Sequence, residues 1–255
     1  MSENKSFSKK SKIVIFWCAL AVLLAAVAFL VYIMLNSYLF QEKPDVVEVS
    51  SVNTSSETLP DNPIDFAPLI EKNIDVYAWI KIPNTVIDYP VLQTTDKSDS
   101  FYLNHDIDGN YKFAGCIYSE KKNRTDFSDR NTVLYGHNML NGTMFQNLHK
   151  FRDKSFFDEN KYIYIYTPKH IFTYEIFAAY KYDNRHLLNS FNYSDDAVFQ
   201  EYLDYIKNPT SMLVNRRDVD LNLESKILTL STCIGNESNF RYLVQGVLIS
   251  DERTK

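Results

Sequence analysis

A cysteine and an arginine near the end of the chain have the residue types and spacing that acyl transfer needs. Cys233 follows the apolar run 227–232, and Arg241 opens the next apolar run after the connection 234–240. A thiolate is a strong nucleophile, and a guanidinium can stabilise the oxyanion that forms on an attacked carbonyl. Side chains at the facing ends of two such strands can converge on one carbonyl. The pair therefore predicts covalent acyl-transfer chemistry at Cys233.

A cysteine nucleophile needs a base or a cation nearby, and histidine is its usual partner. His137 is the first choice because it follows a predicted strand end and a glycine in the segment Tyr135-Gly136-His137-Asn138. His105 is the second choice. The other three histidines lie on a short predicted helix, in a turn and in a polar loop: His149, His170 and His186.

Two alternatives compete with this hypothesis at the level of single residues. Arg241 could be a strand-edge residue that pairs with Glu237 or is merely solvated, since surface ion pairs are common. Cys116 and Cys233 could form a disulfide if they lie outside the cell. Both cysteines lie in apolar runs, and only Cys233 has neighbours suited to chemistry. Free thiols are therefore expected, with Cys116 acting as a small buried apolar residue.

Short runs of β-branched and aromatic residues recur between turn residues and predict eight strands. Eight such strands suggest a closed barrel, so the predicted fold class is mainly β with peripheral helices. The runs are 77–82, 86–93, 113–118, 132–135, 162–166, 171–180, 227–232 and 241–249.

Helical patterns are fewer. They cover residues 65–72, 144–151 and 195–206, and the last carries a one-sided apolar stripe with Phe199, Tyr202 and Leu203. This helix is expected to pack on the barrel rather than to contact a ligand, because amphipathic stripes usually face a core.

The N-terminal region predicts a membrane anchor. Residues 13–35 are apolar and uncharged, which is long enough to cross a bilayer as a helix, and lysines crowd the tail 1–12. The positive-inside rule then places the tail in the cytoplasm and the rest outside the cell. The competing interpretation is a signal peptide cleaved near Ala26-Val27-Ala28, but the apolar run continues beyond that site.

The remaining chain divides into two parts. Residues 36–62 are rich in Ser, Thr, Glu, Asp and Pro and predict an extracellular spacer, and residues 63–255 predict a single catalytic domain. The net charge of −5 gives no electrostatic case for nucleic-acid binding. No cluster of His and Cys has metal-ligand spacing, so neither a metal nor a cofactor is expected.

Several motifs together resemble class B sortases, the cysteine transpeptidases of Gram-positive cell surfaces. Thr229-Leu230-Ser231-Thr232-Cys233 with the downstream Arg241 resembles their active-site strand pair. Residues 131–139 with 142–145 resemble their histidine segment, and residues 79–83, 87–91 and 101–106 resemble other segments. The long insertion that carries the predicted helix 195–206 is also similar to a class B trait. The resemblance implies the sortase β-barrel for nearly all of the chain beyond the membrane.

The resemblance also implies roles for individual residues. Cys233, His137 and Arg241 match the family's cysteine, histidine and arginine. Ser231 matches a residue that helps the arginine or touches the substrate, and Thr232, Tyr174 and Leu187 are further candidates for substrate binding. Some class B enzymes have an acidic residue after the cysteine, where this chain has Ile234. Glu237 is a candidate replacement for that residue.

The reaction that the resemblance implies joins secreted proteins to the cell wall. Cys233 would cleave a C-terminal sorting signal of the Asn-Pro-x-Thr type, forming a thioacyl enzyme, and a lipid-linked peptidoglycan precursor would supply the accepting amine. Two other functions stay open. One is a membrane-anchored cysteine peptidase that resolves the thioester with water, and the other is a non-catalytic binding protein in which Cys233 is inert.

Overall fold

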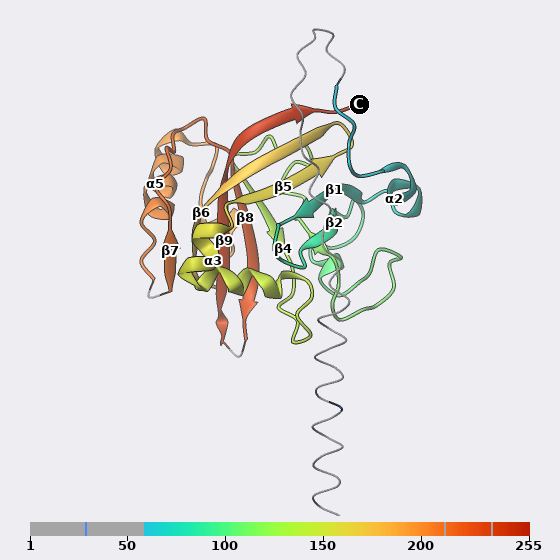
Figure 1. Ribbon diagram of the computed structural model, residues 1–255, viewed down its shortest axis with the longest axis horizontal. Coiled ribbons are helices and arrows are strands. Elements are labelled where there is room, and N and C mark those ends of the chain that lie inside the picture. The colour runs from blue at the N-terminus through green and yellow to red at the C-terminus, as the bar shows by residue number, and fades with distance from the viewer. Residues whose placement is uncertain (1–28, 30–58, 212, 236) are drawn as a thin grey trace, which may run out of the picture. The chain divides into compact units, whose positions relative to one another are not determined.

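A computed structural model describes Phe29 and residues 59–211, 213–235 and 237–255 (Figure 1). Strands dominate this part of the chain. They are β1 (Val76–Lys81), β2 (Asp88–Leu92), β3 (Ile117–Tyr118), β4 (Asn131–Tyr135), β5 (Tyr162–Thr167), β6 (His170–Asp183), β7 (Val214–Arg216), β8 (Ile227–Ile234) and β9 (Glu237–Arg253).

The strands form one sheet that closes on itself. Its order is β5-β1-β2-β3-β4-β8-β9-β6-β7, and β5 also pairs with β6. That additional pairing joins the two ends of an eight-stranded set, which leaves no free edge among its members. The predicted eight-stranded barrel is therefore confirmed. The short strand β7, which the sequence did not predict, adds to the outside of β6.

The predicted strand 113–118 is shorter in the structure, where only Ile117 and Tyr118 are extended. Gly115 has a positive φ of 57°, and its N–H bonds to the Lys112 carbonyl at 2.8 Å, so the chain turns there. A Cβ on Gly115 would lie 2.2 Å from the Leu103 carbonyl oxygen. This close backbone approach needs glycine, and it ends the strand early.

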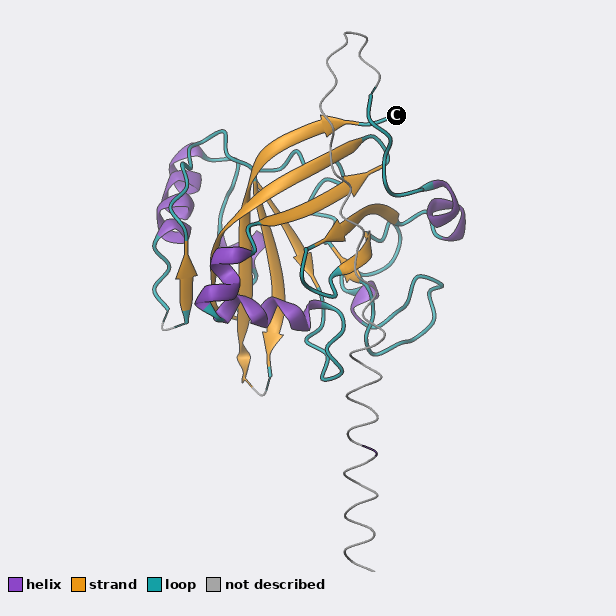
Figure 2. Ribbon diagram, viewed as in Figure 1, coloured by secondary structure: helices purple, strands orange, loops and turns teal. Residues whose placement is uncertain are grey.

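Helices surround the barrel (Figure 2). They are α2 (Ala67–Lys72), α3 (Lys154–Glu159), α4 (Leu187–Ser190) and α5 (Asp196–Lys207), with 3₁₀ segments at Phe101–Leu103 and Phe145–Arg152. The predicted helix 144–151 is thus a 3₁₀ helix, and α3 and α4 were not predicted. Asp195 caps α5 by accepting hydrogen bonds from the backbone N–H groups of Ala197 and Val198.

The two largest of three apolar clusters in the described residues lie on opposite faces of the strands. The barrel interior is filled by side chains such as Ile80, Leu134, Phe145 and Leu230. The outer face of β6 and β9 packs against the stripe of α5, which includes Phe199, Tyr202, Leu203 and Ile206. Burying one such side chain contributes about 1.5–3 kcal/mol. The prediction that this helix packs on the barrel is confirmed.

The last residues of the predicted spacer are bonded to β5 and to the C-terminal residue. The Asn62 amide donates to the Thr167 carbonyl at 2.7 Å, and the backbone N–H of Lys255 donates to the Pro60 carbonyl at 3.1 Å. The last residues of the predicted spacer are therefore packed against the barrel.

The predicted anchor, residues 13–35, lies outside the described residues except for Phe29. Within the described ranges, no helix is long and apolar enough to span a membrane. Apart from Phe29, the predicted tail 1–12, the anchor 13–35 and the spacer up to residue 58 all lie outside those ranges.

Candidate active site

Cys233 and Arg241 face each other across two neighbouring strands. They form a cross-strand pair of the antiparallel strands β8 and β9, and the Cys233 side chain is exposed. The flanking residues Ile234 and Tyr242 belong to the barrel core. Because side chains alternate along a strand, Cys233 and Arg241 point away from that core on one face. The predicted convergence of thiol and guanidinium is present.

The connection between these residues differs from the prediction. Instead of a seven-residue loop before Arg241, β9 already begins at Glu237, and Gly235 lies in the turn with φ +38°. Arg241 therefore lies inside a strand. The extra length was missed because Glu237 and Asn239 are exposed polar residues, so this part of the hairpin has no apolar pattern.

His137 reaches the same end of the sheet through β4, which runs parallel to β8. Tyr135 pairs with Ser231, and the Gly136 N–H donates to the Ser231 carbonyl at 3.2 Å. The Thr232 hydroxyl donates to the Gly136 carbonyl at 2.8 Å. His137 lies two residues after Tyr135, and Cys233 lies two residues after its partner Ser231. Both side chains are therefore presented where the parallel pairing of β4 and β8 ends.

Gly136 has a packing reason for lacking a side chain. A Cβ there would lie 2.5 Å from Cδ1 of Ile117 and 2.8 Å from the Phe145 ring. Glycine lets β4 come this close to the core before the chain turns to present His137.

The His137 ring is held by two neighbours. The Phe113 ring stacks on it, with centroids 5.1 Å apart and planes inclined by 21°, and the Leu103 backbone accepts a hydrogen bond from it. Partial burial lowers the pKa of His137 below its ordinary value, against the opposing effect of the bond to Leu103. At neutral pH the ring is mainly neutral, and its imidazolium form is a stronger acid than that of free histidine.

Cys233, His137 and Arg241 line one pocket of about 260 Å³, here called the catalytic pocket. The structure thus brings together the three residues that the sequence singled out. Three of the four candidate substrate-binding residues also line it: Ser231, Thr232 and Leu187. The other lining residues are Leu103, Tyr118, Tyr135, Gly136, Tyr182, Asn184, Arg185 and His186.

Tyr174 does not reach the catalytic pocket, so its assignment to substrate binding needs correction. Its side chain is 1% exposed and belongs to the barrel core, where its Cβ approaches Gly246. Alternation along β6 turns Tyr174 inward, and a substrate bound at Cys233 cannot contact it.

Glu237, the candidate replacement for the acidic residue, lies on β9. Its carboxylate forms an ion pair with Lys181 on β6. Arg241 Nη1 donates to the Phe240 carbonyl at 2.9 Å. Ile234, which stands directly after the cysteine, is buried in the barrel core and is 6% exposed.

His105, the second choice, serves a structural role. Its ring stacks on Phe101 with centroids 3.9 Å apart, and its Nδ1 hydrogen-bonds to the Phe101 carbonyl at 2.8 Å. His170 pairs with Asp251 at 2.6 Å.

Two other histidines lie closer to the site than the sequence suggested. His186 lines the catalytic pocket, and His149 Nε2 lies 3.0 Å from the Cys233 carbonyl oxygen. Both contacts join segments far apart in the chain, so no local sequence signal could have revealed them.

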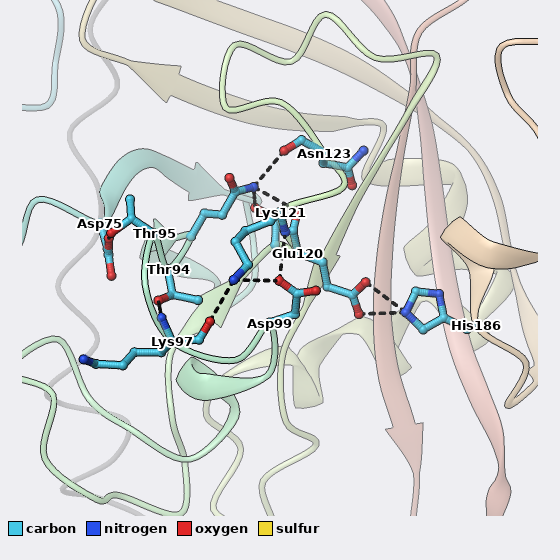
Figure 3. A network of polar contacts seen from close by, with 11 residues as sticks. Asp75, Thr94, Thr95, Lys97, Asp99, Glu120, Lys121, Asn123 and His186 are labelled. Atoms are coloured by element: carbon cyan, nitrogen blue, oxygen red, sulfur yellow. Dashed lines mark hydrogen bonds and ion pairs between the residues drawn. The ribbon is translucent and has the colours of Figure 1, made fainter.

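One wall of the catalytic pocket comes from the segment after β6 and is fastened to the barrel by a contact between His186 and Glu120. Figure 3 shows the Glu120 carboxylate directed at the ring of His186, with Nε2 2.9 Å from the nearest oxygens. The Glu120 side chain is only 15% exposed. Lys121 beside it bonds to the Lys97 carbonyl at 2.8 Å and approaches Asp99. The loop that follows β3 therefore supports the pocket wall.

The two cysteines of the described region are both free and differ sharply in surroundings. Burial raises the pKa of the Cys116 thiol to about 12, so it stays protonated at neutral pH. Cys116 packs beside the apolar cluster of Val76, Leu92 and Tyr102. It is a packing residue, as expected, and Cys233 is the exposed thiol.

A closed β-barrel that brings Cys, His and Arg side chains into one pocket is typical of a cysteine acyl-transfer enzyme. The sortase domain model matches residues 80–249. Sortase B of Listeria monocytogenes is 32% identical over 181 residues, which cover 70% of this chain and 71% of the relative. Sortase B of Staphylococcus aureus is 32% identical over 168 residues, covering 66% of this chain and 67% of the relative.

Solved structures agree. Clostridium perfringens sortase B is similar with a TM-score of 0.66 and 34% identity, over 73% of this chain and 100% of that one. A Staphylococcus aureus sortase B–substrate complex is similar with a TM-score of 0.63 and 31% identity, over 72% of this chain and 84% of that one. The chain belongs to the sortase family and is a cysteine transpeptidase of class B.

Proposed function

We propose that this sortase cleaves the C-terminal sorting signal of secreted proteins and joins them to an amine of a peptidoglycan precursor. The observation that carries the proposal is that Cys233, His137 and Arg241 line the same pocket. Thiol, imidazole and guanidinium there supply a nucleophile, a proton shuttle and an oxyanion stabiliser.

The first half-reaction forms a thioester. The Cys233 thiolate attacks the carbonyl of a threonine in the signal, and the carbonyl electrons move to an oxyanion beside the Arg241 guanidinium. When the oxyanion collapses, the peptide C–N bond breaks, and imidazolium His137 gives its proton to the leaving amine. The lowered pKa of His137 makes this proton donation easier, although fewer molecules carry the proton at neutral pH.

The second half-reaction consumes the thioester. The amine of the acceptor attacks the same carbonyl, neutral His137 takes its proton, and the Cys233 thiolate leaves. An amide links the secreted protein to the cell-wall precursor. The first half-reaction leaves His137 neutral, and the second restores the imidazolium of His137 and the thiolate of Cys233. The enzyme is therefore regenerated without a cofactor.

The donor is proposed to carry an Asn-Pro-x-Thr type signal. This assignment rests on class B membership, and Ser231, Thr232 and Leu187 on the pocket wall are the proposed contacts.

The location is proposed to be the outer face of the cell membrane. The uncharged run 13–35 with its lysine-rich tail supports a single-pass anchor with a cytoplasmic N-terminus. An anchor confines the enzyme to the surface on which a lipid-linked acceptor lies, which favours amine transfer over release into water.

The alternatives differ in what happens at or after the thioester. A surface peptidase would use the same three residues and release the acid with water. A non-catalytic binding protein would bury its cysteine, whereas Cys233 is exposed beside Arg241.

Intact-mass measurement of the soluble domain, residues 59–255, after rapid mixing with a signal peptide tests the proposal. The expected result is an added mass equal to the acyl fragment on Cys233 in the wild-type protein and none in Cys233→Ala. Cleavage of the peptide by Cys233→Ala at the wild-type rate would refute it.

A further inference from the structure

The backbone carbonyl of Cys233 accepts two hydrogen bonds from side chains outside its own hairpin. Asn138 Nδ2 lies 3.1 Å from this oxygen, and His149 Nε2 lies 3.0 Å from it. Asn138 directly follows His137, and His149 lies on the 3₁₀ helix Phe145–Arg152. Two segments that belong to neither β8 nor β9 thus meet at the backbone of the nucleophile.

These donors stand where the parallel ladder between β4 and β8 ends. The Ser231 carbonyl still accepts from the Gly136 N–H at 3.2 Å. Along a strand, carbonyl groups two residues apart point to the same side, so the Cys233 carbonyl also points toward the β4 side. After Gly136 the chain turns away to present His137, and among the described residues the backbone bonds between β4 and β8 end at the Gly136 N–H. The Asn138 and His149 side chains supply the hydrogen bonds to the Cys233 carbonyl that a backbone N–H of β4 would otherwise donate.

The His149 ring is itself fixed. It lies 5.0 Å from the Tyr242 ring, and its Nδ1 is buried with no hydrogen-bond partner among the described residues. Burial and the nearby Arg152 lower the pKa of His149, so the ring is neutral at neutral pH. A carbonyl can only accept, which assigns the proton to Nε2.

We propose that Asn138 and His149 form a two-donor clamp that positions the Cys233 nucleophile against His137 and Arg241. The two are positioning residues, since they bond to the backbone of Cys233 and are not among the residues that line the catalytic pocket. The inference rests on the proposed function. The two hydrogen bonds explain how the Cys233 thiol is held in place, although it lies near the tip of an exposed hairpin with Gly235 in its turn.

The clamp matters because acyl transfer needs the attacking sulfur and the carbonyl carbon in near-contact alignment. A displacement of about 1 Å can cost on the order of a hundredfold in rate. The register between β8 and β9 shifts just after the Cys233–Arg241 pair, so β9 alone holds this point weakly. Losing one donor should leave the carbonyl partly held, and losing both should free it.

The test uses the thioester-forming step of the soluble enzyme. Asn138→Asp keeps the shape of the side chain but removes the donor, and His149→Phe keeps the ring beside Tyr242 without a donor. We expect each change to slow single-turnover thioester formation about tenfold and the double variant on the order of a hundredfold. The KM for the donor peptide and the melting temperature should change little.

Two variants control for charge and for shape. Asn141→Asp adds the same charge to the same exposed loop without touching Cys233, and it should react like the wild type. His149→Gln keeps a donor near the position of Nε2, and it should recover most of the rate lost in His149→Phe. A clamp that merely stabilises the fold would instead lower the melting temperature in step with the rate.

The proposal is overturned if Asn138→Asp and His149→Phe form the thioester at the wild-type rate. It is also overturned if His149→Gln is as slow as His149→Phe, or if the whole loss appears in KM. Alkylation of Cys233 by iodoacetamide needs no sorting signal and should also slow several-fold in the double variant. A wild-type enzyme that forms no thioester would refute the proposed donor, and the alkylation rates would then decide the clamp alone.

Discussion

The exposed ring of Phe113 stacks on the catalytic-site ring of His137, with centroids 5.1 Å apart. Phe113 is 63% exposed, so its ring packs on a residue of the site and not in the barrel core. Burial is the main cause of the lowered pKa of His137, and the Phe113 ring covers one face of that imidazole.

Phe113→Ala should raise the pKa of His137 toward its ordinary value, because removing the ring lets water reach the imidazolium form. NMR titration of the histidine ring protons measures this directly. Tyr111→Ala removes an exposed ring that neighbours His105 instead, and it should leave the titration of His137 unchanged. A fall in the His137 pKa on removing Phe113 would contradict the account.

The stability of the fold should decrease as the pH falls from 7 to 5. The pKa values of His137 and His149 are both lowered in the folded protein, so the unfolded chain takes up protons first as the pH drops. Because the unfolded state then binds more protons than the folded state, the free energy of unfolding decreases as the pH is lowered. Urea unfolding at several pH values measures this slope, and the double variant His137→Gln, His149→Gln should flatten it. An unchanged slope in that variant would assign the effect to other groups.

Arg241→Lys should lower kcat by on the order of a hundredfold. Lysine keeps the charge but loses the planar fork of donors, and removing an oxyanion donor costs about that much. Steady-state cleavage of a signal peptide measures it, with Arg253→Lys at the far end of β9 as the control. Full activity in Arg241→Lys would show that charge alone suffices.

Glu120→Gln should raise the KM for the donor peptide several-fold with a small change in kcat. The substitution weakens the contact between the Glu120 carboxylate and His186, which fastens one wall of the catalytic pocket without touching Cys233. Glu201→Gln on the exposed face of α5 is a matched control for the loss of charge. A loss confined to kcat would place Glu120 in the chemical step instead.

Gly136→Ala should destabilise the domain by about 1–3 kcal/mol and slow catalysis, since its Cβ would press into Ile117 and Phe145. Denaturant unfolding measures the first effect. Gly142→Asn is the control, because that glycine has open space around its Cβ position and a φ that asparagine tolerates. Equal stability of the wild type and Gly136→Ala would contradict the packing argument.

The barrel and the three central residues could be predicted because their signals are local. Apolar runs with β-branched residues specify the barrel strands, and Cys233, His137 and Arg241 each stand at or beside such a run. The proximity of Cys233 and Arg241 followed from their places at the facing ends of two successive strands, and the family resemblance added His137.

The features that were missed depend on contacts between distant segments. Strand β7 has three residues and no apolar pattern, and α4 has only four residues. The inward orientation of Tyr174 follows from the pairing of β6 with β5 and β9, not from its neighbours in sequence. His149 and His186 meet Cys233 and Glu120 across 84 and 66 positions of the chain.

The most direct test of the central claim is the product of a thioester reaction run with and without an acceptor amine. The soluble domain, an Asn-Pro-x-Thr type peptide and a glycine-type or diamino-acid amine are combined, and mass spectrometry separates amide from acid products. We expect the amide to dominate when amine is present and to disappear in Cys233→Ala, His137→Ala and Arg241→Ala. Acid as the sole product with every amine, at an unchanged rate of peptide cleavage, would contradict it and identify a peptidase.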